Sequence, residues 1–468
     1  MSRLVIVSNR MLLPRERLTL AGGLAIALRE TLERQGGLWF GWSGRTTDNP
    51  AETPEMHASG KAIYATIDLS PQDHEDYYLG YANSTLWPLF HYRLGLIDFR
   101  RSQFEGYLRV NAAFAKALKP LLRPDDIVWV HDYHFMTLAA ELRRLGVENR
   151  IGFFLHIPFP PAEVFSALPA HRRLVRDLCA YDLIGFQTEW DLRAFSTYLA
   201  NESGSIIGAD GCFEAFGHRS CAGAFPIGID TDSFTTMAKR AAAGPESERL
   251  KQSLSGRELV IGVDRLDYSK GLPQKVEAFY GLLERWPEHR SRVTFMQIAP
   301  VSRGEVAQYQ TLRCELESAA GRLNGKFAEF DWVPFRYLNK SFTRATLAGF
   351  YRAAKIGFVT PLRDGMNLVA KEFVAAQDPE DPGVLILSRF AGAADELRSA
   401  LVVNPFDVDQ LSETLHEGLI MPLDERRSRH APMIEAIRVN NIGAWKERYL
   451  AALEAVPGAS SLPIASLG

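Results

Sequence analysis

The stretch Ile356-Gly-Phe-Val-Thr-Pro-Leu-Arg-Asp-Gly-Met-Asn-Leu-Val-Ala-Lys-Glu372 carries the most information about the fold of this chain. Its apolar first part, residues 356–362, predicts a buried strand, and the run from Asn367 to Gln377 predicts a helix. Gly365 permits a tight turn between the two. The segment therefore predicts the strand–turn–helix unit on which α/β proteins are built.

This turn offers groups suited to two kinds of ligand atom. The unpaired backbone N–H groups in the first turn of a helix point outward and favour an anion such as phosphate. Asp364 and Glu372 bracket that position, and because carboxylates repel phosphate, we expect both to accept hydrogen bonds from hydroxyl groups. N–H groups that can bind phosphate, next to carboxylates that can accept hydrogen bonds from hydroxyls, favour a sugar nucleotide as the ligand.

Short β-branched runs alternate with longer amphipathic runs along the whole chain. The expected strands are Leu4–Ser8, Ile127–His131, Ile151–His156, Leu183–Gln187, Phe225–Ile229, Leu259–Val263, Val293–Ile298, Phe327–Trp332, Ile356–Thr360, Val384–Ser388 and Leu401–Asn404. The expected helices include Phe135–Leu145, Leu272–Trp286, Glu305–Leu323 and Asp407–Leu419. This alternation favours an α/β fold with parallel sheets that carry helices on both faces, and such sheets bind ligands at the carboxyl ends of their strands.

Length and net charge indicate two domains and give no reason to expect nucleic acid or a membrane as a partner. A chain of 468 residues is too long for one hydrophobic core. We expect a first domain over 1–230, a boundary over the polar stretch 231–257, a second domain over 258–440, and a frayed tail over 457–468. A formal net charge of −3 gives no electrostatic reason to expect nucleic acid or a membrane surface as a partner, and a homo-oligomer is left open.

The cysteines and the N-terminus favour a cytoplasmic protein. Four cysteines in so long a chain, with no C-x-x-C pair, indicate a reducing compartment and no disulfide framework. The N-terminal apolar run is too short for a signal peptide or a membrane span.

A second motif, Arg265-Leu-Asp-Tyr-Ser-Lys-Gly271, follows the expected strand Leu259–Val263. Arg265 offers a planar fork and Lys270 a mobile point charge, and together they would neutralise a diphosphate. In isolation such a pair is more often two solvated loop charges, but the neighbouring Asp364 motif reverses that preference. Gly22 and Gly23 follow the first strand, and there they either let the backbone approach a ligand or simply open a helix.

Polar side chains also end the strands of the first half. His131 and His134 have no third ligand at metal-binding spacing, so we expect no metal site. Asp132 and His156 are better suited to hydrogen-bonding a neutral sugar, although a single histidine at a strand end is more often structural. Further candidates are Arg10 and Arg303 for a second phosphate, with Tyr77 and Trp87 for stacking against a sugar ring.

Taken together, these motifs resemble the trehalose-6-phosphate synthase family of retaining glycosyltransferases. The resemblance runs from Ser8-Asn-Arg10 to about Asn441, which is nearly the whole chain. Besides the two motifs above, it includes Ala21–Leu24, Gly36–Gly44, Leu86-Trp-Pro, Gly106–Asn111, Trp129–His134 and Gly152–Pro160. The segment Met11–Leu20 departs from the pattern expected of enterobacterial members, and the family places it beside both substrates.

The resemblance implies the GT-B fold, in which two doubly wound, Rossmann-like domains face a central cleft, with the last helix, 441–456 here, returning to the first domain. It also implies transfer of glucose from a nucleotide sugar, most often UDP-glucose, to glucose 6-phosphate. The implied donor contacts are Gly22, Gly23, Arg265, Lys270, Phe342, Asp364, Gly365, Met366, Asn367, Leu368, Val369 and Glu372, with His156 on the donor sugar. The implied acceptor contacts are Arg10, Tyr77, Trp87, Asp132 and Arg303.

The family is thought to work without a carboxylate nucleophile. No metal-ligand cluster is visible in the sequence, so we expect activity that survives chelation, and we expect no cofactor. Substitution on one face of the sugar would let the departing phosphate deprotonate the acceptor, with Arg265, Lys270, Asp364 and His156 as the catalytic groups. Rival interpretations are a related synthase with another acceptor, such as glycerol 3-phosphate, a cyclitol-joining pseudo-glycosyltransferase, or a non-catalytic sugar-phosphate sensor.

Overall fold

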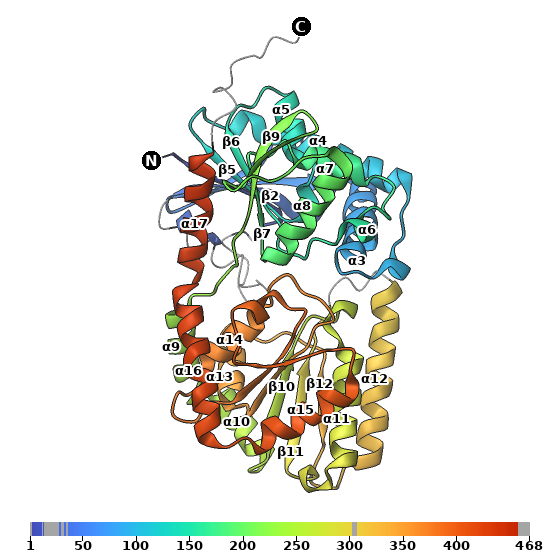
Figure 1. Cartoon of the computed structure of the whole chain (residues 1–468), viewed down its shortest axis with the longest axis vertical. Helices are drawn as coiled ribbons and strands as arrows, with labels where there is room; N and C mark the ends of the chain where they lie inside the picture. Colours follow the sequence, from blue (N-terminus) through green and yellow to red (C-terminus); the bar gives the residue numbers. More distant parts are fainter. Residues whose placement is uncertain are drawn as a thin grey trace. The chain divides into compact units, whose positions relative to one another are not determined.

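The chain divides into two compact units in the computed structural model, which describes residues 2–11, 13, 28–29, 32–33, 36–301 and 307–456 (Figure 1). The first unit comprises Met1–Arg17, Leu24–Pro226 and Trp445–Gly468, and the second comprises Leu18–Gly23 and Ile227–Ala444. Each unit is built on a mostly parallel sheet with helices, which confirms the predicted α/β class. Gly22, Gly23, Arg303 and the tail 457–468 lie outside the described residues.

The first unit contains a sheet of nine strands in the order β3-β4-β2-β1-β5-β6-β7-β9-β8. The strands are β1 (Leu4–Arg10), β2 (Gly37–Thr46), β3 (Glu55–Ser59), β4 (Ala62–Leu69), β5 (Ile127–His131), β6 (Arg150–Phe154), β7 (Leu183–Phe186), β8 (Cys212–Ala215) and β9 (His218–Ala224). Only the outermost pairs, β3–β4 and β8–β9, are antiparallel. The interior strands are apolar because helices cover both of their faces.

The helices of this unit include one long π-helix, η2 (His74–Leu86). The others are α2 (Pro71–Asp73), α3 (Trp87–Phe90), η3 (Leu94–Leu96), α4 (Arg101–Leu118), η4 (Lys119–Leu121), η5 (Tyr133–Phe135), α5 (Leu138–Arg144), α6 (Ala162–Phe165), α7 (His171–Leu178), α8 (Glu189–Ser203) and α17 (Ile442–Ala455). From Trp445 onward, α17 packs on this sheet: Tyr449 stacks on Trp129 at 4.7 Å and donates its hydroxyl to the Phe153 carbonyl at 2.9 Å. Gly152 makes room, because a Cβ there would lie 2.4 Å from that hydroxyl.

The second unit contains a fully parallel sheet in the order β12-β11-β10-β13-β14-β15. Its strands are β10 (Glu258–Val263), β11 (Val293–Ile298), β12 (Phe335–Leu338), β13 (Ile356–Val359), β14 (Val384–Ser388) and β15 (Leu401–Val403). Its helices are α9 (Thr231–Ala242), α10 (Pro245–Leu254), η6 (Tyr268–Lys270), α11 (Leu272–Arg285), η7 (Pro287–His289), α12 (Ala307–Phe327), α13 (Arg344–Ala353), α14 (Leu368–Ala376), η8 (Gly392–Asp395), α15 (Val408–Ile420) and α16 (Leu423–Val439). Among the described residues, no helix is long and apolar enough to cross a membrane.

Two expected strands are wrong. Residues 225–229 form no strand. Phe225 still donates its N–H to the Phe186 carbonyl at 2.8 Å, but Pro226 lacks an N–H group, and Gly228 lies against the backbone of Asn440, where a Cβ would be 2.0 Å from the carbonyl oxygen. Residues 327–332 instead end α12 and form a tight turn, in which Glu329 and Trp332 exchange backbone hydrogen bonds of 3.0 and 3.1 Å. The strand of this region is β12, three residues further on.

The stretch 231–257, expected to be an irregular boundary, forms α9 and α10 within the second unit. Asp230 caps α9 by accepting the Ser233 N–H at 3.1 Å, and Pro245 occupies the first turn of α10. Both helices pack on α13. The polar composition of this stretch is therefore that of surface helices.

The expectation of no disulfide is also wrong. Phe216 and Gly217 both have positive φ angles and make the two-residue turn between β8 and β9. That register places Cys212 directly opposite Cys221, with Cα atoms 3.9 Å apart, and the two are joined by a disulfide. The Phe216-Gly217 turn was the sequence signal that could have revealed this pairing.

Candidate active site

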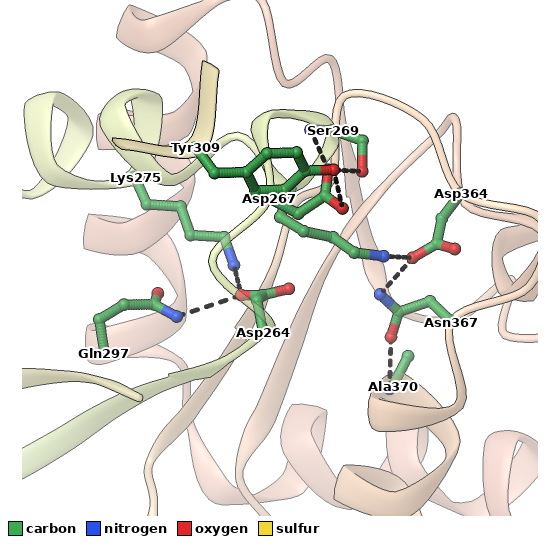
Figure 2. Close-up of polar contacts among 10 residues, drawn as sticks. Asp264, Asp267, Ser269, Lys275, Gln297, Tyr309, Asp364, Asn367 and Ala370 are labelled. Carbon is green, nitrogen blue, oxygen red and sulfur yellow. Dashed lines mark hydrogen bonds and ion pairs between the residues drawn. The ribbon is translucent and has the colours of Figure 1, made fainter. Parts of the chain in front are cut away.

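The loop after β10 is held in one conformation by Asp267. This fully buried carboxylate accepts the Ser269 N–H at 2.9 Å, the Ser269 hydroxyl at 2.8 Å and the Tyr309 hydroxyl at 3.3 Å (Figure 2). The resulting 3₁₀ turn, η6, ends at Lys270. Gly271 follows with φ +65°, and a Cβ there would lie 2.7 Å from the Thr360 carbonyl oxygen, so only glycine lets this loop approach the end of β13.

The two predicted motifs meet at Lys270 and Asp364. The Lys270 Nζ lies 2.5 Å from Asp364 Oδ2, and both side chains are mostly buried. Asn367 donates its side-chain N–H to the same Asp364 oxygen at 3.0 Å and accepts the Ala370 N–H at 3.2 Å (Figure 2). Asn367 therefore caps α14 while it orients Asp364.

Asn367 adopts this position in an unfavourable backbone conformation. Its φ is +78°, in the left-handed region that a non-glycine residue seldom adopts. Backbone hydrogen bonds hold the loop around it: Leu362 N–H donates to the Ser269 carbonyl at 2.7 Å, and Asp364 N–H donates to the Phe390 carbonyl at 3.0 Å. Such locally strained geometry is typical of ligand-binding sites. Gly365 and Met366 are buried, while Leu368 and Val369 form the first turn of α14.

A buried ion pair lies directly behind this loop. The Lys275 Nζ lies 2.5 Å from Asp264 Oδ2, and both side chains are at most 2% exposed. Gln297 also donates to this Asp264 oxygen, at 3.2 Å (Figure 2). Burial lowers the pKa of Lys275, and the Asp264 carboxylate opposes that effect. The sequence analysis missed this ion pair. The pair holds Asp264 in place, and Asp264 directly precedes Arg265, whose own side chain is exposed.

Glu372 has a partner that the sequence analysis did not name. Arg344 of α13 donates from Nε to Glu372 Oε1 at 3.1 Å, and its guanidinium lies 4.8 Å from the Phe234 ring. Burial raises the pKa of Glu372, and the Arg344 charge partly offsets that rise. Phe342 is half-buried and packs edge-on against Phe350 at 5.6 Å.

In the first unit, Arg10 is exposed at the end of β1, but Tyr77 is fully buried. The Tyr77 hydroxyl donates to Asn9 Oδ1 at 2.9 Å, and burial raises its pKa well above the ordinary value. This tyrosine thus supports the residue beside Arg10 and presents no face for stacking. Trp87 is likewise nearly buried and lies 4.1 Å from the His91 ring.

Tyr78, next to Tyr77 in η2, is a partly exposed aromatic residue that the sequence analysis passed over. Its ring stacks on His134 at 6.0 Å and on His74 at 5.4 Å, with Trp42 at 5.6 Å. Tyr77 and Tyr78 are neighbours in the π-helix η2, so composition alone could not tell which of them is buried. Single aromatic residues with a partly exposed face are suited to a sugar ring.

Asp132 and His156 lie together at the ends of β5 and β6. Asp132 has φ +76° and accepts the His156 N–H at 3.2 Å. His156 Nε2 lies 3.0 Å from His131 Nδ1, and its Nδ1 lies 3.4 Å from the Gln187 amide nitrogen. Burial lowers the pKa of His156 to about 3 and holds that of His131 well below its usual value, so both rings are neutral at neutral pH.

A family model for glycosyltransferase family 20 matches residues 5–455 of this chain. The chain belongs to glycosyltransferase family 20. The match spans both units, and it includes every described residue to which we have assigned a site role.

Known proteins are similar to this chain over nearly its whole length. A trehalose-6-phosphate synthase of Klebsiella pneumoniae is 50% identical over 454 residues, covering 97% of this chain and 95% of that protein. An α,α-trehalose-phosphate synthase (UDP-forming) of Burkholderia xenovorans, solved with glucose-6-phosphate, is 49% identical with a TM-score of 0.94, covering 97% of this chain and all of that one. An E. coli protein bound with UDP-2-fluoro glucose is 48% identical with a TM-score of 0.93, covering 98% and 100%. These solved structures confirm the GT-B fold.

Because His131 and His156 are buried in the neutral form, we expect this family 20 member to lose stability at acidic pH. An unfolded histidine binds a proton near pH 6.5, whereas folded His156 stays neutral down to about pH 3. Between these values the unfolded state binds more protons, so the free energy of unfolding should fall with pH, by about 1.4 kcal/mol per pH unit for each such group. Urea unfolding of the wild type at pH 7, 6 and 5 measures this slope.

The histidine variant His156→Gln tests the assignment of that slope. The substitution should lower the number of protons taken up on unfolding by about one, and the unfolding free energy should therefore depend less steeply on pH, because glutamine does not titrate. His57→Gln, on β3 of the same sheet, serves as the control. A slope that is the same in wild type and His156→Gln would contradict the assignment.

Proposed function

We propose that this chain transfers glucose from UDP-glucose to glucose 6-phosphate with retention, giving α,α-trehalose 6-phosphate and UDP. The observation that carries the proposal is the Lys270–Asp364–Asn367 cluster at the carboxyl ends of β10 and β13. It joins a cation suited to a diphosphate with a carboxylate suited to sugar hydroxyls. The ligands bound by the Burkholderia xenovorans and E. coli relatives supply the two substrates of the proposal.

The donor contacts are assigned as follows. Arg265 and Lys270 hold the diphosphate, Asp364 holds the transferred glucose and Glu372 holds the ribose hydroxyls. The N–H groups of Leu368 and Val369 belong to the first turn of α14 and suit an anion. Phe342 lies near the base, and Gly22 and Gly23 lend backbone N–H groups.

The ion pair between Lys270 and Asp364 has a role before the donor binds. Two mostly buried charges are stable only when each has a partner. In the free protein they satisfy one another. When the donor binds, the diphosphate takes over Lys270 and sugar hydroxyls donate to Asp364, so neither charge is left unpaired.

The acceptor contacts are assigned to Arg10, Arg303, Asp132, Trp87 and the Tyr77–Tyr78 pair. Arg10 and Arg303 hold the acceptor phosphate. Tyr78 offers the accessible ring, and Tyr77 positions the backbone beside Arg10 through Asn9. His156 is neutral, so it contributes hydrogen bonding to the donor sugar and no charge.

The reaction needs no nucleophile from the protein. The bond from the anomeric carbon to the diphosphate oxygen breaks, and the acceptor hydroxyl attacks on the same face. Its proton passes to the departing diphosphate oxygen, and Arg265 and Lys270 stabilise the charge that develops there. Asp364 and Glu372 are thereby assigned to binding.

Chelation should leave turnover intact, because side-chain cations neutralise the leaving diphosphate in this scheme. We expect the initial rate of UDP release to be the same before and after treatment with excess EDTA. Complete loss of activity with EDTA, restored by a divalent ion, would contradict the scheme.

The proposed substrates also favour a cytoplasmic location, because both are phosphorylated metabolites that charge retains inside cells. Substrate choice is tested by measuring nucleotide diphosphate release over a grid of UDP-, ADP- and GDP-glucose against glucose 6-phosphate and glycerol 3-phosphate. We expect the highest kcat/KM for UDP-glucose with glucose 6-phosphate. A preference for glycerol 3-phosphate would support the related synthase, and no release with any pair would support a sensor.

A further inference from the structure

A group of metal-binding side chains lies in the second unit, away from the residues assigned to the donor. Glu288 and His289 belong to η7, which leads into the amino end of β11, and His416 belongs to α15. Arg265 and Asp364 follow the carboxyl ends of β10 and β13. Because the strands of this sheet are all parallel, Glu288 and His289 lie at the amino ends of the strands, and Arg265 and Asp364 lie at the opposite, carboxyl ends.

The three side chains point their ligand atoms at one another. His289 Nε2 lies 2.9 Å from His416 Nδ1, and one ligand atom from each of the three residues lies within 4.8 Å of the others. His289 is buried, His416 is half-buried and Glu288 is exposed. Trp286 stacks on the His416 ring at 4.6 Å and 10°, which fixes the plane of that imidazole.

We propose that Glu288, His289 and His416 bind one Zn²⁺ ion, with water as the fourth ligand. Two imidazole nitrogens and one carboxylate oxygen are a recurrent ligand set for zinc, whereas Ca²⁺ and Mg²⁺ prefer sites made of oxygen atoms. In this structure His289 Nε2 and His416 Nδ1 form a hydrogen bond with one another.

The present geometry is close to what tetrahedral coordination requires. With Zn–N bonds of about 2.0–2.1 Å, two ligand nitrogens are about 3.3 Å apart. The two rings therefore need to separate by about 0.4 Å from their present 2.9 Å. The imidazole that donates the hydrogen bond moves its proton to its other nitrogen, so both rings stay neutral as they bind the ion.

The ion would strengthen a junction that already exists between α11 and α15. Arg285, at the end of α11, pairs with Asp409 and Glu413, and Ser412 donates to the Ala278 carbonyl at 2.9 Å. His416 lies on the same face of α15, one turn beyond Ser412. The expected effect of the ion is therefore on the stability of the second unit, with turnover unchanged.

Zinc titration of the full chain tests the site. After treatment with EDTA and its removal, calorimetric titration with ZnCl₂ should show one site per chain, and CoCl₂ should give the visible absorption of tetrahedral cobalt. Removing a residue that only hydrogen-bonds to a metal ligand weakens metal binding by about 10–100-fold. Removing a ligand itself, in His289→Ala or His416→Ala, should therefore weaken zinc binding by at least about 100-fold. Zinc should raise the Tm of the wild type and leave that of His416→Ala unchanged.

His57→Ala is the matched control, because His57 lies 3.3 Å from Glu55 but belongs to no group of three metal-binding side chains among the described residues. It should bind zinc as the wild type does. No zinc binding by the wild type, or equal affinity in His289→Ala and His416→Ala, would overturn the proposal. The two ligand variants should keep wild-type UDP release, so failure of the metal site and failure of the proposed transfer reaction are separable.

Discussion

Replacing Lys270 by alanine should lower kcat by about 10²–10³-fold at saturating donor, the loss typical of removing one charge-stabilising contact. Lys270 is held by the Asp267 turn and by Asp364, so its ammonium is positioned before the substrate binds. The donor diphosphate already carries negative charge, and one more negative charge develops on it as the bond breaks, so the loss of a contact to that added charge should appear in kcat. Steady-state UDP release with UDP-glucose and glucose 6-phosphate measures it.

Lys326→Ala is the control for this result. Lys326 is an exposed lysine of the same unit and lies 2.6 Å from Glu284, so it shares the charge type and the ion pairing of Lys270. Its removal should leave kcat unchanged. Arg265→Ala should show a loss of the same order as Lys270→Ala. Near-wild-type kcat in either variant, with Tm unchanged, would refute the assignment of the two cations to the diphosphate.

Replacing Lys275 by methionine should cost about 3–5 kcal/mol of unfolding free energy, the usual loss when one partner of a buried ion pair is removed. The stem of methionine fills similar space, so the loss comes from Asp264, which keeps its buried charge with the Gln297 amide as its one remaining side-chain donor among the described residues. Urea unfolding measures this as a shift in midpoint at constant slope.

The double variant Asp264→Asn/Lys275→Met separates charge from packing. It removes both charges, so it should recover much of the stability that Lys275→Met loses. Lys326→Met, at an exposed pair, should stay within about 0.5 kcal/mol of the wild type. A loss below about 1 kcal/mol in Lys275→Met would show that the pair does not hold the loop before Arg265.

Local patterns predicted the donor half of the site because its groups are close in sequence. Asp364, Asn367 and the start of α14 lie within five consecutive residues. The strands β10 and β13 are apolar runs that are flanked by polar residues, glycine or proline. The alternation of strands and helices was sufficient for the fold class. The distant partners Arg344 and Tyr309 were out of reach, because nothing in their local sequence distinguishes them from ordinary surface or core residues.

Residues whose role depends on burial were the hardest to assign. Lys275 looks like a solvated charge on an amphipathic helix, yet it is fully buried with Asp264. Tyr77 and Tyr78 are adjacent, and the π-helical geometry of η2 decides which of them is accessible. In the β8–β9 hairpin, the spacing of Cys212 and Cys221 acquires meaning only once the Phe216-Gly217 turn sets the register.

The central claim is retaining transfer of glucose onto glucose 6-phosphate, and NMR of the product tests it most directly. UDP-glucose labelled with ¹³C at the anomeric carbon is incubated with glucose 6-phosphate and the full chain, and the spectrum is followed with time. The account predicts one product with an α,α-1,1 linkage, formed in equal amount with UDP and only when glucose 6-phosphate is present. A β linkage at the labelled carbon, or release of free glucose with no new glycosidic bond, would contradict it.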